Sequence, residues 1–316
     1  MSKSIGLPYM GSKRKLASQI VDKILEDNPN TKYVYDLFGG GGSISFEFLK
    51  RENVAQVIYN DANKSISTLL ETIRDNGIGE EFYAWIDKET FGALRYDDNW
   101  YSGFVKSCWS FGNNQRSYLY GKYIRDYKKL FHEVVVDGID SLKEMGCFIQ
   151  KHVYDKTGLN KKISLTMPAE TEYNRRKLNI GRQINAYQKK VGGIDICILK
   201  QLEHINNIEN LRKIAYSEEV DVRRLDILNT DYLDVMINTP VNETIIYLDP
   251  PYENTFQYEK DVSHNELWDY IKQLPYKVYV SGYDSPLNEV ESYNHYSQIS
   301  HRGKNHVEEK LFCNNA

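Results

Sequence analysis

Cysteine is scarce in this sequence, and its placement argues against a structural zinc site. The four cysteines lie far apart along the chain, with no CxxC pair and no cluster of cysteine with histidine. They are Cys108, Cys147, Cys197 and Cys313. Isolated cysteines of this kind are typical of a protein in a reducing compartment. We therefore expect a protein that works without a bound metal ion.

Long apolar segments are also missing. No apolar run reaches the roughly 18 residues that a membrane-spanning helix needs. The N-terminal segment MSKSIGLPYMGSKRKL contains no apolar stretch that could act as a signal peptide. We therefore expect a protein that does not associate with membranes and stays in the cytoplasm.

The sequence lacks the overall positive charge that would suggest a nucleic-acid-binding protein, since its net charge is −4. The charge is unevenly distributed, however. Residues 174–190 hold six basic side chains and no acid, and residues 115–129 hold five against Asp126 alone. Basic runs like these are ordinary on a solvated helix face. Because both fall in the same middle region, the sequence is also compatible with a basic groove on an otherwise acidic protein.

The first part of the chain alternates strands with helices. Residues 32–37 (KYVYDL) and 56–61 (QVIYND) are short, apolar and rich in β-branched and aromatic residues, which predicts buried strands. Residues 43–51 and 64–75 predict the helices that follow them. This βαβα order is the beginning of a doubly wound α/β sheet.

The alternation stops near residue 80 and resumes near residue 220. Tyrosine, asparagine and basic residues dominate the intervening part. The later part predicts strands at residues 220–227, 245–252 and 277–284, a helix at 265–274, and a closing hairpin from 295–301 and 306–312. The sequence thus predicts one α/β domain, residues 1–79 and 215–316, interrupted by a mainly helical insertion at residues 80–214.

A glycine-rich loop, Asp36-Leu-Phe-Gly-Gly-Gly-Gly-Ser43, lies between the first strand and the first helix. Glycines there let backbone amides approach a ligand, although the loop could equally be a tight turn. The dinucleotide fingerprint GxGxxG fails, because Ile44 or Ser45 occupies its third glycine position, and no phosphate-binding GxxxxGK[ST] is present. Asp61 ends the second strand, where an acid can bind both ribose hydroxyls. A nucleoside without pyrophosphate, such as S-adenosylmethionine, fits better than NAD.

The segment Asp249-Pro250-Pro251-Tyr252 follows an apolar strand and therefore emerges at the carboxyl edge of the sheet. One interpretation is that the two prolines have no role beyond ending the strand. The pairing of a carboxylate with an aromatic ring on a rigid backbone favours chemistry on an exocyclic amine. Asp249 and the Pro250 carbonyl could each accept one N–H of that amine, and Tyr252 could stack on the base.

These motifs resemble the Dam-type DNA adenine-N6 methyltransferases, in which cofactor motifs come first, target recognition lies in the middle and the DPPY motif comes last. The similarity covers roughly residues 5–75 and 220–313. It implies a Rossmann-like S-adenosylmethionine-dependent methyltransferase sheet with a mainly helical target-recognition insertion. It also implies transfer of a methyl group to N6 of an adenine flipped out of double-stranded DNA.

The resemblance and the motifs together assign candidate site residues in three groups. The catalytic residues are Asp249, Pro250, Pro251 and Tyr252. The residues expected to bind S-adenosylmethionine are Tyr9, Lys13, Asp36, Phe38, Gly40, Gly42, Asp61, Asp231, Tyr232 and Asp249. Asp226 competes with Asp231 for the place beside the cofactor's adenine. The residues expected to bind DNA are Arg116, Lys122, Arg175, Arg176, Lys177 and Arg182.

Alternative functions differ in the chemistry of the catalytic motif. N4-cytosine methyltransferases usually have serine, and RNA or protein-glutamine methyltransferases asparagine, where this chain has Asp249, which favours adenine. A catalytically decayed methyltransferase fold that only binds DNA is a further alternative, although the motif residues are all suited to their roles. We expect a monomer or weak dimer in a bacterial or phage-infected cell, where a cognate restriction endonuclease could accompany it, as in restriction-modification.

Overall fold

The computed structural model describes residues 4–122, 124–136, 202–251, 262–300 and 303–314, and these divide between two compact units. The first unit comprises Met1–Asp75, Asp98–Gly103 and Lys213–Ala316. The second comprises Asn76–Asp97 and Phe104–Arg212. The first unit therefore joins segments from both ends of the chain, and it also includes a short piece from within the middle region.

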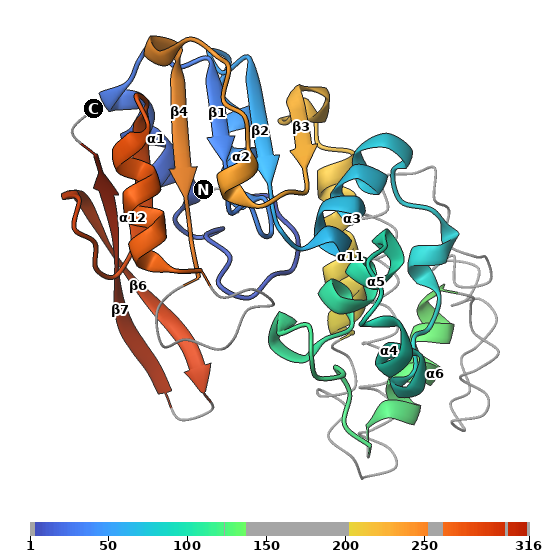
Figure 1. Ribbon diagram of the computed structural model, residues 1–316. Coiled ribbons are helices and arrows are strands. Elements are labelled where there is room, and N and C mark those ends of the chain that lie inside the picture. Colours follow the sequence, from blue (N-terminus) through green and yellow to red (C-terminus); the bar gives the residue numbers. More distant parts are fainter. Residues whose placement is uncertain (1–3, 123, 137–201, 252–261, 301–302, 315–316) are drawn as a thin grey trace. The chain divides into compact units, whose positions relative to one another are not determined.

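The first unit is built on a seven-stranded sheet with the order β3-β2-β1-β4-β5-β7-β6 (Figure 1). The strands are β1 (Tyr33–Asp36), β2 (Gln56–Asn60), β3 (Leu225–Leu228), β4 (Thr244–Leu248), β5 (Lys277–Gly282), β6 (Asn288–Ser300) and β7 (Gly303–Cys313). Strands β1 to β5 pair in parallel, whereas β7 runs antiparallel to β5 and β6. The sheet confirms the predicted Rossmann-like α/β class.

The central strands are short apolar runs because helices or loops cover both of their faces. Val34 of β1 lies in register with Val57 of β2 on one side and with Ile245 of β4 on the other. All three side chains are buried. A parallel sheet buried on both faces favours continuous β-branched and aromatic residues over alternation with polar ones. This pattern made β1, β2 and β4 recognisable in the sequence.

Side-chain alternation divides the sheet between two layers of helices. Tyr35 and Leu37 share one face with Ile246 and Leu248, and there they pack with Leu267 of α12 (His264–Gln273), which Figure 1 shows beside β4. Asp36 points to the other face, where α2 (Ser43–Leu49) follows the glycine loop. Helix α1 (Ala17–Asp27) precedes β1 in the chain, and α3 (Lys64–Asn76) follows β2.

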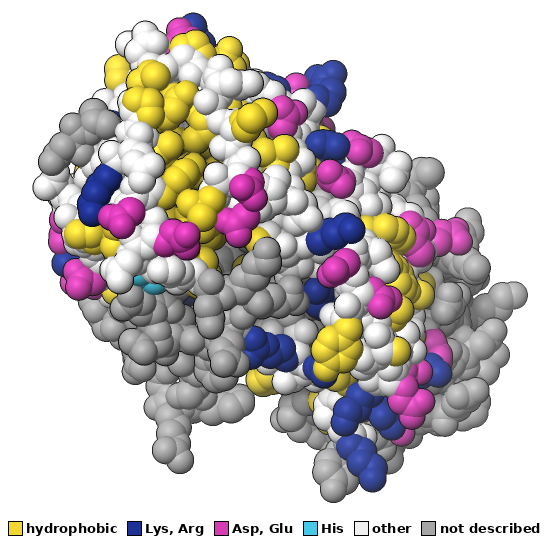
Figure 2. Space-filling view, viewed as in Figure 1, with side chains coloured by type: hydrophobic (Ala, Val, Ile, Leu, Met, Phe, Trp, Pro, Cys, Tyr) yellow, Lys and Arg dark blue, Asp and Glu magenta, His cyan; other side chains and the backbone are white. Residues whose placement is uncertain are grey.

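The α12 face also carries exposed apolar side chains. Figure 2 shows hydrophobic residues gathered on the side of the first unit where α12 and the β3–β4 connection lie. Leu233, Met236 and Val241 belong to that connection and are exposed, Met236 by 83%. The connection contains only short 3-10 turns, Tyr232–Asp234 and Val241–Glu243, so it covers the sheet less fully than a long helix would.

Several elements differ from the sequence-based prediction. The strand predicted at residues 245–252 ends at Leu248, before the two prolines. The predicted strand at residues 220–227 begins instead with a 3-10 turn, Val222–Arg224, because Asp221 accepts the Arg223 amide and caps it; β3 starts only at Leu225. Strand β6 begins at Asn288, where antiparallel pairing with Cys313 extends it beyond the predicted hairpin. Helix α1 was not predicted at all.

Apart from an isolated bridge between Ser110 and Tyr118, the regular elements described in the second unit are helical. They are α4 (Lys88–Leu94), α6 (Arg125–Val136), most of α5 (Trp100–Cys108) and α11 (Glu203–Ala215), and the 3-10 turns Glu80–Tyr83 and Phe111–Asn113. None of the helices that the structure describes, in either unit, has the length and apolar character needed to cross a membrane.

A buried histidine pair lies at the centre of the second unit. Tyr120 Oη lies 2.7 Å from His204 Nδ1, and His204 Nε2 lies 2.9 Å from His132 Nδ1. The rings of Trp85 and Trp109 enclose both imidazoles, with the Trp109 and His204 centroids 4.1 Å apart. Burial lowers the pKa of His132 to about 4 and that of His204 well below its usual value. Both histidines are therefore neutral near pH 7 and share hydrogen bonds within an aromatic core.

Candidate active site

A pocket of about 340 Å³ lies at the carboxyl ends of β1, β2 and β4 in the first unit. This is the edge at which ligands bind in open parallel sheets. Its wall includes the following candidate residues: Tyr9, Lys13, Asp36, Phe38, Gly40, Asp61, Asp249, Pro250 and Pro251. The structure therefore brings together residues from the N-terminal segment, the glycine loop and the DPPY segment.

The glycine loop takes its shape from three positions that disfavour a side chain. Gly40 has a left-handed φ of 47°, and Gly42 has a φ of 72° where it begins α2. A Cβ at Gly39 would lie only 2.1 Å from the ring of Tyr59, whose hydroxyl donates to the Gly40 carbonyl at 2.8 Å. The loop thus packs against β2 on one side and leaves its other side to the pocket.

The N-terminal segment lies against this loop. The Leu7 amide donates to the Gly41 carbonyl at 2.8 Å. The ring of Tyr9 covers Gly40, since a Cβ there would lie 3.1 Å from Tyr9 Cε1. Tyr9 is therefore both part of the pocket wall and a contact of the glycine loop.

Asp61 connects the glycine loop to the turn after β2. Its Oδ2 accepts the Gly40 amide and its Oδ1 accepts the Asn63 amide, each at 2.8 Å. These two bonds fix the carboxylate at the rim of the pocket. An acid in this orientation can still accept hydrogen bonds from a ligand, since each carboxylate oxygen accepts more than one.

Asp36 is almost fully buried and only half satisfied. Ser45 Oγ donates to its Oδ2 at 2.6 Å, whereas Oδ1 has no hydrogen-bond partner among the described residues. Burial, followed by the negative charges of Asp249 and Asp61, raises the pKa of Asp36 to about 7, although the Ser45 bond opposes this. A buried carboxylate oxygen in a pocket wall without a partner points to a ligand that donates to it.

Lys13 links the DPPY segment to strand β7. Its Nζ lies 2.8 Å from Asp249 Oδ1 and 3.5 Å from Glu309 Oε1 on β7. The side chains of Lys13 and Glu309 are 7% and 3% exposed, and that of Asp249 is 20% exposed. One buried ammonium therefore serves two carboxylates, of which Asp249 is the one that reaches the pocket.

A second pocket of about 100 Å³ adjoins the first and shares Phe38, Ala62 and Val262 with it. Its wall also holds Asp231 and Tyr232, whose ring lies 5.0 Å from that of Phe38. The competing acid, Asp226, is exposed on β3 and accepts a hydrogen bond from Gln56 Nε2 at 2.5 Å. The structure therefore brings Asp231, and not Asp226, to the pockets.

A family model of D12 class N6 adenine-specific DNA methyltransferases matches residues 9–308. The chain belongs to this family. No curated protein matches the chain. Membership confirms the resemblance seen in the sequence: the protein is an enzyme that methylates the N6 amine of adenine in DNA, and a methyltransferase of this kind implies S-adenosylmethionine as methyl donor. The cytosine-N4 alternative is thereby set aside.

The candidate DNA-binding residues of this methyltransferase fall into two sets. Arg116 and Lys122 are exposed in the second unit, and the Arg116 carbonyl accepts a hydrogen bond from Arg95. Arg175, Arg176, Lys177 and Arg182 lie outside the described residues, as does Tyr252 of the catalytic motif. Their expected roles stay predictions.

The methyltransferase pocket also contains residues that the sequence did not indicate. Ser12, Asn63, Lys64 and Asp98 line it. Glu309 was missed as well, although one signal was present. Glu309, Leu311 and Cys313 are two residues apart on one strand and so share a face, which places an acid on a buried face. Among the described residues, no group of three or more histidine, cysteine or acidic side chains is placed to hold a metal ion.

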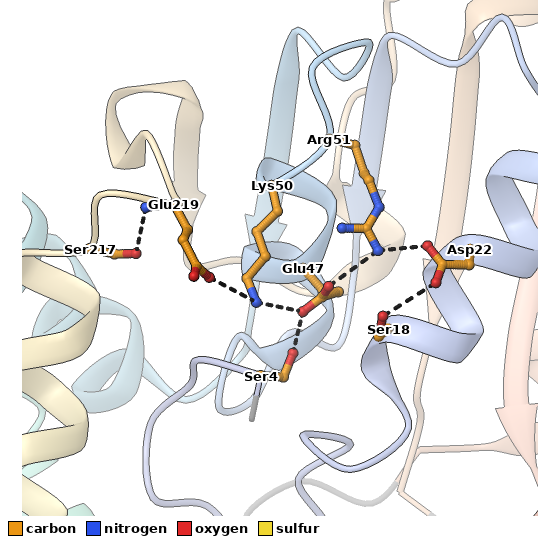
Figure 3. Close-up of polar contacts among 8 residues, drawn as sticks. All are labelled: Ser4, Ser18, Asp22, Glu47, Lys50, Arg51, Ser217 and Glu219. Atoms are coloured by element: carbon orange, nitrogen blue, oxygen red, sulfur yellow. Dashed lines mark hydrogen bonds and ion pairs between the residues drawn. The ribbon is translucent and has the colours of Figure 1, made fainter. Parts of the chain in front are cut away.

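A polar network anchors the elements beneath the glycine loop (Figure 3). Glu47 of α2 is buried and accepts a hydrogen bond from Ser4 Oγ at 2.5 Å. Lys50 and Arg51 lie 3.0 and 3.2 Å from the same carboxylate, and Arg51 continues to Asp22 of α1 at 2.6 Å. The network ties the N-terminal segment, α1 and α2 together, and so supports the placement of Tyr9 and Lys13.

Proposed function

We propose that the pocket beside the glycine loop binds S-adenosylmethionine and that the DPPY segment presents the target amine to it. The charge of the pocket carries this proposal. Asp36, Asp61 and Asp249 line one pocket, and the buried Lys13 ammonium is shared between Asp249 and Glu309. S-adenosylmethionine carries positive charge on its sulfonium and its α-ammonium groups, so an acidic pocket suits it.

The half-satisfied Asp36 supports the fit of the methionine end. Its Oδ1 is buried in the pocket wall without a partner among the described residues, and the buried Ser12 hydroxyl is in the same situation. The α-ammonium group would donate to Asp36, and Ser12 would donate to the α-carboxylate. Each contact would remove an unsatisfied buried polar atom.

The nucleoside end would occupy the pocket on the β2 side. Asp61 is held at the rim by two backbone amides, in position to accept from the ribose hydroxyls. The adjoining pocket is lined by the packed rings of Phe38 and Tyr232, which would contact the adenine ring, and by Asp231. Lys13 and Tyr9 would approach the cofactor from the N-terminal segment, and Gly40 and Gly42 would keep the loop clear of side chains.

The target adenine would enter beside Asp249. When bound, S-adenosylmethionine supplies an electrophilic methyl group, so the protein needs no metal to activate it. Asp249 and the Pro250 carbonyl would each accept one N6–H bond and so direct the nitrogen lone pair toward the methyl group. Pro250 and Pro251 hold these acceptors rigid. Tyr252, outside the described residues, is proposed to stack on the base.

This chemistry requires the adenine to leave the helix, because N6 is paired and stacked inside B-DNA. We assign DNA contacts to the insertion, including Arg116, Lys122, Arg175, Arg176, Lys177 and Arg182, which would bind mainly phosphates. The proposal further includes a monomer or weak dimer acting on cellular DNA in the cytoplasm of a bacterial or phage-infected cell, with a cognate endonuclease as a further partner.

Sequencing of plasmid DNA by a method that detects N6-methyladenine tests the proposal. Plasmid from a host that expresses the wild-type chain should carry methylated adenines in one short sequence context. Unmethylated plasmid from that host would contradict it. Ultraviolet crosslinking of labelled S-adenosylmethionine then separates the alternatives: a protein that crosslinks but leaves the DNA unmethylated fits the decayed, DNA-binding alternative.

A further inference from the structure

Glu309 is a buried acid that no part of the proposed catalytic chemistry uses. It lies on β7, is 2% exposed, and shares a buried face of that strand with Leu311 and Cys313. Burying a carboxylate is costly unless a cation and hydrogen bonds compensate it. A glutamine or a leucine would fill this position at lower cost, so the charge itself calls for a function.

The charge of Glu309 acts on Lys13. The Lys13 ammonium lies between Glu309 Oε1 at 3.5 Å and Asp249 Oδ1 at 2.8 Å. Asp249 follows β4 and Glu309 belongs to β7, and β5 lies between these strands in the sheet. Glu309 lies beside Lys310, which pairs with Gly282 at the end of β5. Lys13 therefore bridges two strands that do not touch each other, at the edge where the pocket opens.

Counting charges shows what Glu309 adds. Lys13 and Asp249 alone sum to zero, whereas Lys13, Asp249 and Glu309 together sum to −1. A lysine that serves only Asp249 would cancel the negative charge that makes Asp249 a strong hydrogen-bond acceptor. When Lys13 is shared with Glu309, the group as a whole stays negative beside the pocket.

Methyl transfer makes this difference matter. The positive charge begins on the sulfonium and moves to the adenine N6 as the new carbon–nitrogen bond forms and the carbon–sulfur bond breaks. A net negative group nearby stabilises the sulfonium in the bound state and the N6 cation that replaces it. A neutral group would do neither.

Resting on the function proposed above, we propose that Glu309 is a positioning residue for this methyltransferase. Through Lys13 it orients Asp249 and keeps the Asp249–Lys13–Glu309 group negative. It touches neither the cofactor nor the base. This role predicts a signature that a merely structural role would not produce: Glu309 should matter more for the cationic cofactor than for S-adenosylhomocysteine, whose sulfur is neutral.

Calorimetry with both ligands on the full chain at pH 8 tests this signature. Glu309→Gln keeps the size of the side chain and removes its charge, so it should weaken S-adenosylmethionine binding about tenfold relative to S-adenosylhomocysteine. Because Glu309 orients Asp249 through Lys13, its loss should also misplace the acceptor of the target amine and slow single-turnover methylation by about tenfold or more. Glu309→Asp, which keeps the charge, should retain the wild-type preference between the ligands. Glu308→Gln is the matched control, since this neighbour is exposed, and it should change nothing.

The double variant Lys13→Met/Glu309→Gln tests whether Glu309 acts through Lys13. It returns the net charge to −1, so the preference for S-adenosylmethionine over S-adenosylhomocysteine should recover toward that of the wild type. Equal weakening of both ligands by Glu309→Gln, or wild-type affinities and rate, would overturn the inference. If the wild-type chain bound neither ligand, the proposed function itself would fail. Thermal unfolding of each variant identifies any loss of fold. If Glu309→Gln does not fold, the ligand preference of Glu309→Asp decides: a preference unlike that of the wild type would overturn the inference.

Discussion

The backbone amide of Gly40 donates a 2.8 Å hydrogen bond to Oδ2 of Asp61, which joins the left-handed glycine of the first loop to the acid that follows β2. The other oxygen of Asp61 accepts the Asn63 amide. One carboxylate therefore sets the position of two loops that line the same pocket. Its removal should affect both the proposed contact with the ribose and the two loops that it joins.

Asp61→Ala should raise the S-adenosylmethionine concentration needed for half-saturation. The lost hydrogen bonds involve a charged group, so the cost should be about 1.5–3 kcal/mol of binding free energy. Isothermal calorimetry measures it directly. Asp226→Ala, at the exposed acid that the sequence left as a rival for another site, should bind the cofactor normally. Unchanged affinity in Asp61→Ala would remove this residue from the site.

Asp249→Ala should abolish methyl transfer while it preserves the fold. The change removes an acceptor directed at the reacting amine, and loss of one such preorganised group raises the barrier by about 3 kcal/mol or more. Single-turnover assays with saturating DNA and cofactor measure this effect. Asp284→Ala, at an exposed acid after β5, should turn over normally. A fully active Asp249→Ala enzyme would contradict the catalytic assignment.

Asp36→Asn should stabilise the cofactor-free protein at pH 8 while it weakens S-adenosylmethionine binding. The pKa of Asp36 rises from 3.8 in the unfolded chain to about 7 in the fold, so the folded state retains a proton that the unfolded state has lost. Stability is therefore lost as pH rises from 3.8 to 7, by roughly 4 kcal/mol at most. Urea unfolding at pH 8 and pH 4 should show a gain for the variant only at pH 8. A variant that is equally stable and binds equally well would contradict the role of Asp36.

Acid should destabilise the second unit through its buried histidine pair. The pKa of His132 is about 4 in the fold and 6.5 in the unfolded chain, so the unfolded state binds more protons between these values. Stability is present above pH 6.5 and falls as pH decreases toward 4, by roughly 3 kcal/mol for this residue. Tryptophan fluorescence during urea unfolding at pH 7 and pH 5 measures the loss, because Trp85 and Trp109 contact the pair. His132→Asn should show a smaller pH dependence; a dependence equal to that of the wild type would contradict this account.

Neutralising Arg175, Arg176 and Lys177 together should weaken binding to any DNA duplex. Each lost phosphate contact should reduce the slope of log affinity against log salt concentration by about 0.9. Titrations at several salt concentrations measure the slope. Neutralising Lys23, Lys32 and Lys272 of the first unit provides a control of equal charge. If both triple variants kept the wild-type slope, residues 174–190 would be only a solvated surface.

Local features made much of the fold and part of the site predictable. Strands β1, β2 and β4 are apolar runs that end at glycine, aspartate or proline, and helices α2 and α3 follow β1 and β2 closely. The glycine loop and the DPPY segment each lie directly after a strand, so parallel pairing alone brings them to one edge. Strand β6 could not be bounded in this way, because its first residues are polar and become a strand only by pairing with β7.

The sequence by itself determined the α/β class, the glycine loop and the adenine-specific motif, because each could be read from residues that are neighbours in the chain. Only the tertiary structure showed that Asp231 lines a pocket and Asp226 does not, since Asp226 lies on β3 itself and Asp231 on the segment that follows it. Only the tertiary structure placed Lys13 between Asp249 and Glu309. These three residues come from opposite ends of the chain, and their charges act on one another only after the sheet has brought β4 and β7 to either side of β5.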